Sequence, residues 1–169
     1  RTKWTDNIQL PGMLHLAMVR SPFAHATIDA IDTSAAAASP GVIAVFTGAD
    51  LADSQGVNIN AWPIAPDQVT PTHLPVAVER VACAGEIVAV VAARSAAAAR
   101  DAVELVDVEW GELAAVLDLK EAAADTVLAH PSLGTNTSAF WKLDSAEQGT
   151  GGDVDEAIAI LACICGVCG

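Results

Sequence analysis

An uninterrupted apolar segment, residues 87–93, places the strongest constraint on the fold of this chain. Its sequence is Ile-Val-Ala-Val-Val-Ala-Ala, and several of these residues are β-branched, which favours a strand. A strand that is apolar on both sides is typical of the centre of a sheet whose two faces are both covered. We therefore expect residues 87–93 to form a central strand of the protein core.

The residues that follow predict a helix and another strand. Ser95 is placed to cap a helix over residues 96–104, in which alanine predominates. Apolar residues at positions 106, 108 and 110 then alternate with acidic residues, as in a strand with one wet face. Strand, helix and strand together predict a compact βαβ unit.

Two strands are predicted on the N-terminal side of this unit. Residues 13–19 follow a Pro-Gly turn and are apolar apart from one histidine, which predicts a largely buried strand. Residues 24–31 alternate, with positions 26, 28 and 30 on one side, which predicts a half-buried strand. Because only the short break at residues 20–22 separates the two runs, we expect them to form a hairpin.

Two short helices and one further strand complete the predicted elements. Residues 35–38 form a helix that begins after Asp-Thr-Ser and ends before Ser-Pro-Gly. Residues 42–46 are predicted to form the next strand. Asp118 is followed three residues later by a glutamate, which resembles a capping box and predicts a helix through residue 124.

The remaining segments lack a sustained period. Residues 50–73 contain three prolines among Asn, Asp, Gln and Thr, which predicts a long loop. We expect a first domain over residues 1–125 and an extended connection over residues 126–159. Residues 160–169 form an atypical cysteine-rich tail.

Composition bounds the class of protein. The chain has 169 residues, of which 53% are hydrophobic, and this predicts a folded chain with one core. The formal charge of -13 repels a phosphate backbone, so we expect no nucleic acid partner. No apolar run reaches the roughly 20 residues of a transmembrane segment, and the polar start lacks the apolar core of a signal peptide. The four cysteines do not suit an extracellular disulfide framework, and we expect a cytoplasmic protein.

Several motifs resemble one enzyme family. Leu-Pro-Gly-Met-Leu-His at residues 10–15, Arg-Ser-Pro-Phe-Ala-His at residues 20–25 and Gly85-Glu86 are similar to the opening of molybdenum hydroxylase large subunits. This family includes carbon monoxide dehydrogenases, aldehyde oxidases and xanthine dehydrogenases, and the first motif is most like the aerobic carbon monoxide dehydrogenase branch. Leu-Gly-Thr-Asn at residues 133–136 and Gly-Asp-Val-Asp-Glu-Ala at residues 152–157 continue the resemblance in order. It implies an α/β hammerhead-like domain of the α+β class, with a mixed β-sheet and short helices.

The same resemblance implies the cofactors and partners of an intact enzyme. They are molybdopterin cytosine dinucleotide, [2Fe-2S] clusters and FAD, held by the molybdenum-binding domain and by the FAD and iron-sulfur subunits. The family places its catalytic glutamate and its pterin contacts beyond the hammerhead. We therefore assign no catalytic, cofactor-binding or metal residue in this chain and expect it to be inactive alone.

Two hypotheses for the function follow from this resemblance. The first is a non-catalytic N-terminal structural domain of the large subunit, whose apolar surface packs against the molybdenum-binding domain and partner subunits. The alternative is a free-standing acidic binding or assembly module that has lost the catalytic domain.

Cysteines near the end of the chain are candidate metal ligands. Cys163, Cys165 and Cys168 offer thiolates within six residues, and Cys83 would complete a tetrahedral site for zinc or an iron-sulfur cluster. The spacing is not that of a plant-type cluster, and a chain terminus makes a poor cage. We favour an oxidation-prone tail that holds no metal.

The candidate catalytic residues each have a plainer structural interpretation. No two histidines have the spacing of a metal-binding pair, and Ser21 lacks an identifiable base. Acidic residues on the strand near position 109 fit a solvated face, and the Gly-x-Gly-Gly sequence at residues 149–152 fits a linker because acidic residues follow it. Arg20 and His25 are candidate partner contacts, although we favour a structural turn. The histidines are His15, His25, His73 and His130, and the acidic residues are Asp107, Glu109 and Glu112.

Overall fold

The computed structural model describes residues 4–56, 65, 67–143 and 158–161 of the chain. The chain divides into two compact units. The first unit consists of residues 1–56 and 75–112, and the second consists of residues 57–74 and 113–169. Part of the predicted long loop therefore belongs to the same unit as the segment after Glu112. The predicted limits of the first domain, residues 1–125, stay a prediction.

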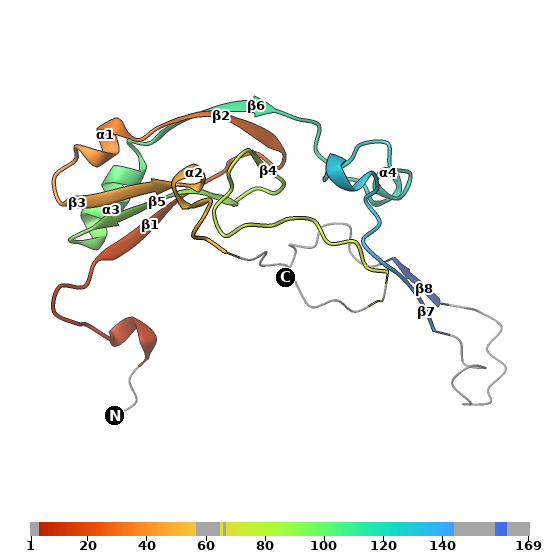
Figure 1. Ribbon diagram of the computed structural model, residues 1–169, viewed down its shortest axis with the longest axis horizontal. Coiled ribbons are helices and arrows are strands. Elements are labelled where there is room, and N and C mark those ends of the chain that lie inside the picture. Colours follow the sequence, from red (N-terminus) through yellow and green to blue (C-terminus); the bar gives the residue numbers. More distant parts are fainter. Residues whose placement is uncertain (1–3, 57–64, 66, 144–157, 162–169) are drawn as a thin grey trace. The chain divides into compact units, whose positions relative to one another are not determined.

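The first unit contains two antiparallel sheets of three strands each (Figure 1). The first sheet consists, in order, of β1 (His15–Arg20), β5 (Ile87–Ala93) and β3 (Val42–Thr47). The second consists, in order, of β4 (Arg80–Val81), β2 (Ala26–Asp32) and β6 (Asp107–Glu112). The apolar segment 87–93 is thus the central strand of its sheet, as predicted.

Short helices precede or connect these strands. They are the 3-10 helix η1 (Thr5–Asn7) and the α-helices α1 (Ser34–Ala37), α2 (Gly48–Leu51) and α3 (Ala96–Val103). The helices predicted at residues 35–38 and 96–104 are confirmed, and Ser95 caps α3 by accepting a bond from the N–H of Ala98 at 3.2 Å. Helix α2 was not predicted. It begins with a capping box between Thr47 and Asp50.

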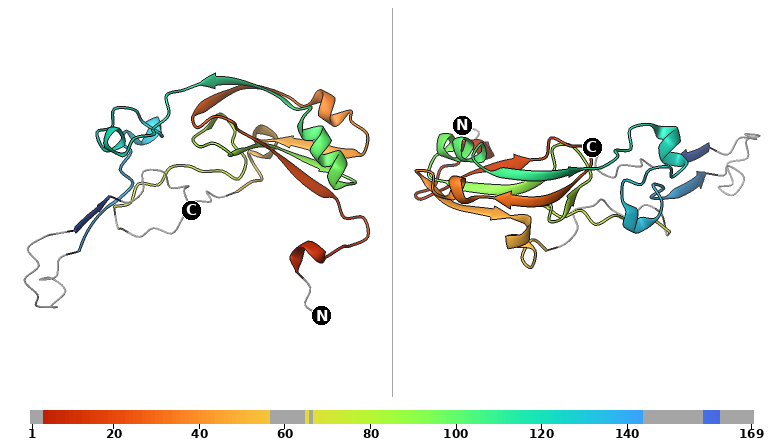
Figure 2. Two further views of the ribbon diagram at one scale, coloured as in Figure 1. Left: turned by 180° about the vertical axis from the view of Figure 1, so that it is seen from behind. Right: turned by 90° about the horizontal axis from the view of Figure 1, so that it is seen from above.

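The core of the first unit is built from small apolar side chains. Val81, Val88 and Val91 are the largest of its fully buried residues. One cluster joins β1, β2, β4 and β5, and a second joins β5 to α1 and α3. Helices α1 and α3 lie beside the β1-β5-β3 sheet (Figure 2). Alanine at the helix contacts lets these short helices approach the sheet closely.

Two predicted strand arrangements are wrong. β1 and β2 do not form a hairpin, because β1 pairs with β5 while β2 pairs with β4 and β6. β5 and β6 lie in different sheets, so they do not form a βαβ unit with parallel neighbours. The α+β class with short helices is confirmed, whereas all strand pairs among the described residues are antiparallel rather than mixed.

The alternation predicted for β2 also breaks. The register of β2 against β6 shifts between Ile28 and Ala30. Ile31 then packs against the core, while Ala30 is exposed. An extra residue in one strand turns the following side chains to the other face. Positions 26, 28 and 30 were expected on one side of the strand, and this alternation ends after Ile28.

The second unit has fewer regular elements. They are α4 (Leu119–Ala123), the 3-10 helix η2 (Pro131–Leu133), and the antiparallel pair of β7 (Phe140–Leu143) and β8 (Ile158–Leu161). Helix α4 confirms the helix predicted from Asp118, whose carboxylate accepts the N–H groups of Lys120 and Glu121 at 2.8 and 3.0 Å. In the described parts of the two units, no helix is long and apolar enough to cross a membrane.

Candidate functional site

Two of the sequence motifs, the one that begins at Arg20 and the Gly85-Glu86 pair, meet at one end of β1. The N–H of Ser21 donates to the carbonyl of Glu86 at 2.9 Å, and the N–H of Gly85 donates to the carbonyl of Ser21 at 2.8 Å. These reciprocal bonds extend the antiparallel contact of β1 and β5 beyond the register shift at Arg20. We call residues 20–23 and 82–86 the motif junction. It is formed by segments that are far apart in the sequence.

Arg20 strengthens the motif junction. Its Nη1 donates to the carbonyl of Gly85 at 2.6 Å, and its Nη2 lies 3.5 Å from the sulfur of Met18. Gly85 has φ +91°, a conformation that side chains of L residues rarely adopt. The glycine thus turns its carbonyl toward Arg20 at a low conformational cost. Arg20 thus has a structural role, as favoured from the sequence, but its partner is distant in the chain rather than within a local turn.

The other polar side chains of the junction also bind backbone groups. The Ser21 hydroxyl accepts the N–H of Phe23 at 3.0 Å and donates to the Phe23 carbonyl at 2.9 Å. Glu86 accepts the N–H of Ala82 at 2.8 Å, and the Cys83 thiol lies 4.0 Å from the same carboxylate oxygen. These contacts lie within the two turns and stabilise each of them. They leave the buried Ser21 hydroxyl in a structural role rather than in that of a nucleophile.

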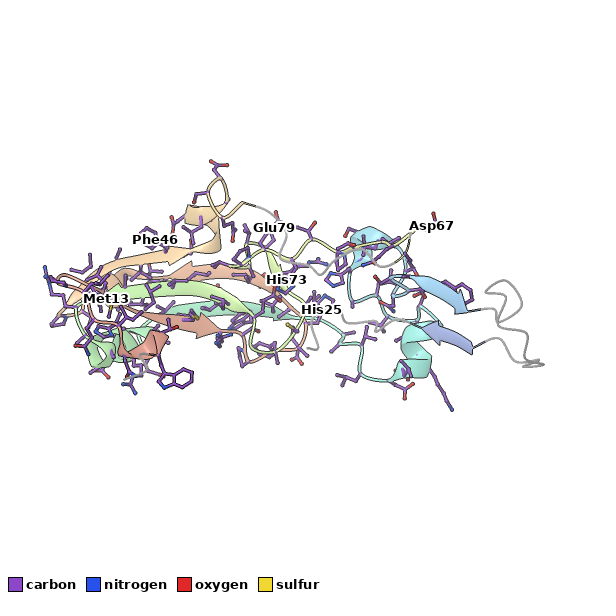
Figure 3. The ribbon with its side chains drawn as sticks, turned by 90° about the horizontal axis from the view of Figure 1, so that it is seen from below. Met13, His25, Phe46, Asp67, His73 and Glu79 are labelled. Carbon is purple, nitrogen blue, oxygen red and sulfur yellow. The ribbon has the colours of Figure 1, made fainter. Side chains whose placement is uncertain are left out.

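The described histidines come from different segments of the two units. His15 lies in β1, and the buried His25 immediately precedes β2 (Figure 3). His73 and His130 belong to the second unit. Within the described ranges, no group of three or more His, Cys, Asp or Glu side chains is arranged to hold a metal ion. The terminal cysteines Cys163, Cys165 and Cys168 and the Gly-x-Gly-Gly sequence lie outside these ranges.

The acidic side chains lie on the exposed side of β6 or accept hydrogen bonds at the starts of helices. Asp107, Glu109 and Glu112 are exposed along β6, while the residues between them are partly buried. The hydroxyl and N–H of Ser34 hold the pKa of Asp32 below its ordinary value of 3.8. The N–H and hydroxyl of Thr47 likewise lower the pKa of Asp50. Hydrogen bonds to the charged form cause both pKa shifts, and neither carboxylate is poised as a general acid.

The second unit contains a buried polar centre that the sequence analysis missed. Asn136 is 5% exposed, and its Oδ1 accepts the N–H of Ala129 at 2.9 Å. Its Nδ2 donates to the carbonyls of Ala122 and Val127 at 3.1 and 2.6 Å. The Asp125 carboxylate accepts the N–H of Asn136 at 2.6 Å. We call these five residues the Asn136 clasp.

The clasp orders a segment that was expected to be an extended connection. Asp125 has φ 53°, and its carboxylate also accepts the hydroxyl of Thr135 at 2.9 Å. Asp is one of the few residues that adopt this left-handed conformation readily. The Leu-Gly-Thr-Asn motif was a signal for this site. The hydrogen-bond partners of the Asn136 side chain are backbone groups, which leave no pattern in the sequence.

A small pocket adjoins the Asn136 clasp. Its volume is about 20 Å³, which has room for one or two water molecules and not for an organic substrate. The pocket is lined by Val69, Pro71, His130, Leu133, Thr135, Asn136, Thr137 and Ser138, all in the second unit.

Residues 1–114 match the family described as the aldehyde oxidase and xanthine dehydrogenase a/b hammerhead domain. The matched range contains the motif junction and all elements of the first unit. Since it covers more than half of the chain, the match establishes the family.

Individual relatives agree with this match. The chain is 37% identical to the nicotine 6-hydroxylase large subunit of Paenarthrobacter nicotinovorans, over 94% of this chain and 19% of that protein. It is 41% identical to the carbon monoxide dehydrogenase large chain of Afipia carboxidovorans, over 68% of this chain and 14% of that protein. The crystal structure of quinoline 2-oxidoreductase from Pseudomonas putida 86 matches with a TM-score of 0.77 and 36% identity, over 89% of this chain and 19% of that one.

The chain thus spans less than a fifth of each of these proteins. The resemblance that the motifs predicted is confirmed, and the motif junction explains why two separated stretches carry it. They are two turns joined by reciprocal backbone hydrogen bonds. The chain belongs to the family of molybdenum hydroxylase large subunits, and its residues 1–114 match the α/β hammerhead domain of that family.

Proposed function

We propose that this chain is a non-catalytic structural domain at the N-terminal end of a cytoplasmic molybdenum hydroxylase large subunit. The proposal rests on the hydrogen bonds that the polar side chains of the motif junction make. Arg20 and Ser21 bind backbone groups of their own domain, and Glu86 does the same. Side chains so engaged support a fold and leave the chemistry to other parts of the large subunit.

We infer that the cofactors that the family implies are held outside the described residues. These residues form no cluster of metal ligands, and the pocket at the Asn136 clasp is of water size. A pterin dinucleotide, [2Fe-2S] clusters and FAD would be held by the molybdenum-binding domain and by FAD and iron-sulfur subunits. We derive no step of the reaction from the residues of this chain.

A carbon monoxide dehydrogenase is our proposal for the parent enzyme. The opening motif favours that branch, and the 41% identity to the Afipia carboxidovorans large chain supports it. The nicotine 6-hydroxylase large subunit matches a larger share of this chain at 37% identity. Substrate oxidation by the native gene product, measured with carbon monoxide and with nicotine, decides between the two.

The structural role is tested on the native gene product. We expect its intact mass to exceed 17.2 kDa several-fold and the purified sample to contain molybdenum and iron. The 169-residue chain alone should oxidise neither carbon monoxide nor an aldehyde with an artificial electron acceptor. A native product of about 17.2 kDa without molybdenum would instead support the free-standing acidic module.

A further inference from the structure

Among the described residues of the first unit, the β1-β5-β3 sheet has one covered face and one open face. In register, Ala17 lies beside Val91, which lies beside Val45. Val91 packs in a cluster with Ala36 of α1 and Ala102 of α3, and Val45 packs against that cluster. These residues form the covered face. Paired residues on neighbouring strands point to the same side of a sheet, and the next residues along point to the other.

The open face consists of two cross-strand rows. One row is Met18, Val90 and Phe46, and the other is Leu16, Ala92 and Ala44. Leu16 is 63% exposed, and Met18 and Phe46 are each 42% exposed, whereas Ala92 at the centre of its row is buried between its neighbours. Every side chain of the two rows is apolar. Figure 3 labels Phe46 on the β3 edge of this sheet.

We propose that the open face, defined by these two rows, docks against the part of the large subunit that lies beyond the hammerhead domain. This inference rests on the proposed function and deepens it. The strand β5 is the first support, because it is apolar on both sides, as strands are when both faces of their sheet are covered. Among the described elements, α1 and α3 cover one face, and an apolar partner is needed for the other.

The length of the related subunits and the charge of this chain indicate which partner covers the open face. The matched region is 19% of the nicotine 6-hydroxylase large subunit and 14% of the carbon monoxide dehydrogenase large chain, so most of each protein lies outside it. A second copy of this chain would bring together two molecules of formal charge -13, which repel each other. Arg20 is a charged group beside the two rows, since its guanidinium lies 3.5 Å from the Met18 sulfur and is already bonded to Gly85. The face therefore suits an apolar intramolecular partner.

The methionines provide a direct test. The chain contains only two, and Met13 and Met18 are 41% and 42% exposed. In the 169-residue chain, we expect dilute hydrogen peroxide to oxidise both at rates within about twofold of each other. In the native gene product, we expect Met18 to be oxidised at least tenfold more slowly than in the chain alone. Met13, outside the two rows, serves as the internal reference, and peptide mass spectrometry measures each sulfoxide.

A pair of substitutions tests the same contact by assembly. Leu16→Lys places a charge on the open face, and Leu105→Lys is the matched control because Leu105 is 45% exposed in the connection from α3 to β6. We expect both variants of the 169-residue chain to melt within a few degrees of the unsubstituted chain. In the native subunit, Leu16→Lys should lower the yield of molybdenum-containing enzyme about tenfold, while Leu105→Lys should not.

The outcomes separate the docking inference from the proposed function. If a long, molybdenum-containing product oxidises Met18 as fast as the 169-residue chain does and tolerates Leu16→Lys, the docking inference is overturned and the proposed function stands. A native product that lacks molybdenum overturns both. Protection of Met18 that depends on concentration in the 169-residue chain would show a second copy on the face and overturn the choice of occupant.

Discussion

The Asn136 clasp gives the sharpest prediction about the stability of the second unit. Asn136→Ala removes three side-chain hydrogen bonds and leaves the N–H of Ala129 and the carbonyls of Ala122 and Val127 without that partner. Each buried group left without a hydrogen bond costs roughly 1 kcal/mol at the low end of the usual range. We therefore expect the free energy of unfolding to fall by about 3 kcal/mol. A water molecule in the adjoining pocket would reduce this loss.

A second substitution separates hydrogen bonding from side-chain volume. Asn136→Asp keeps the size and the acceptor for Ala129, but it turns a carboxylate oxygen toward the carbonyls of Ala122 and Val127. The Asp125 carboxylate is nearby, bonded to the N–H of residue 136. Both surroundings disfavour a second negative charge and raise the pKa of the new aspartate above its unfolded value. Its protonated form would donate to one of the two carbonyls.

The sign of the pH dependence follows from this raised pKa. The folded state of Asn136→Asp holds its proton more tightly than the unfolded state. The variant is therefore nearest to the unsubstituted chain below the unfolded pKa of about 3.9, and its deficit grows as the pH rises toward the folded pKa. Asn7→Asp is the matched control, because Asn7 is exposed on η1 of the first unit and its substitution adds the same charge.

Hydrogen exchange and urea unfolding measure both effects. In Asn136→Ala, we expect the amide of Ala129 to lose protection, whereas in Asn136→Asp it keeps its acceptor and a larger share of its protection. The urea midpoint should fall for Asn136→Ala at every pH, and for Asn136→Asp more at pH 7 than at pH 4. Unchanged exchange over residues 119–138 in Asn136→Ala would refute the assignment of the clasp as the centre of this segment.

Three further substitutions test the first unit. Gly48→Ala would drive a methyl group into the carbonyl of Ala77, and we expect a loss of roughly 1–3 kcal/mol in urea unfolding. Gly85→Ala meets no neighbouring atom but must adopt φ +91°, so we expect a loss of about 1–2 kcal/mol, seen as a melting temperature lower by a few degrees. Asp50 has a lowered pKa, so its bond to Thr47 stabilises the fold fully above the ordinary value of 3.8 and fades as the pH falls through the lowered value. The melting temperature of Asp50→Asn should therefore depend less on pH in the acid range than that of the unsubstituted chain.

Local elements of the fold were predictable because their causes are local. Ser95 caps α3, and Asp118 caps α4, as the spacing of each polar residue before its helix predicts. The apolar run of β5 likewise identified a central strand. Each of these signals comes from neighbouring residues and the backbone that they occupy. They survive in the structure because tertiary contacts agree with them.

Strand pairing was not predictable in the same way. The turn after β1 has the length of a hairpin connection, yet its Ser21 bonds to Gly85 and Glu86, and β1 pairs with β5. Periodicity shows which side of a strand is apolar and does not show which strand lies beside it. Asn136 was missed for a related reason. A side chain whose partners are backbone groups has no complementary residue type in the sequence.

The strand β5 differs from its prediction in another way, because its sequence predicts two covered faces and the described helices cover one. This difference is informative about the protein beyond this chain. The described helices cover the face of Val91 and leave that of Val90 between the exposed Met18 and Phe46. A solvated face would permit polar residues at alternate positions of the strand, as β6 shows with Asp107 and Glu109. β5 has none at its seven positions. The composition of this strand therefore suits a subunit in which the second face is also buried, and the oxidation rate of Met18 measures whether it is.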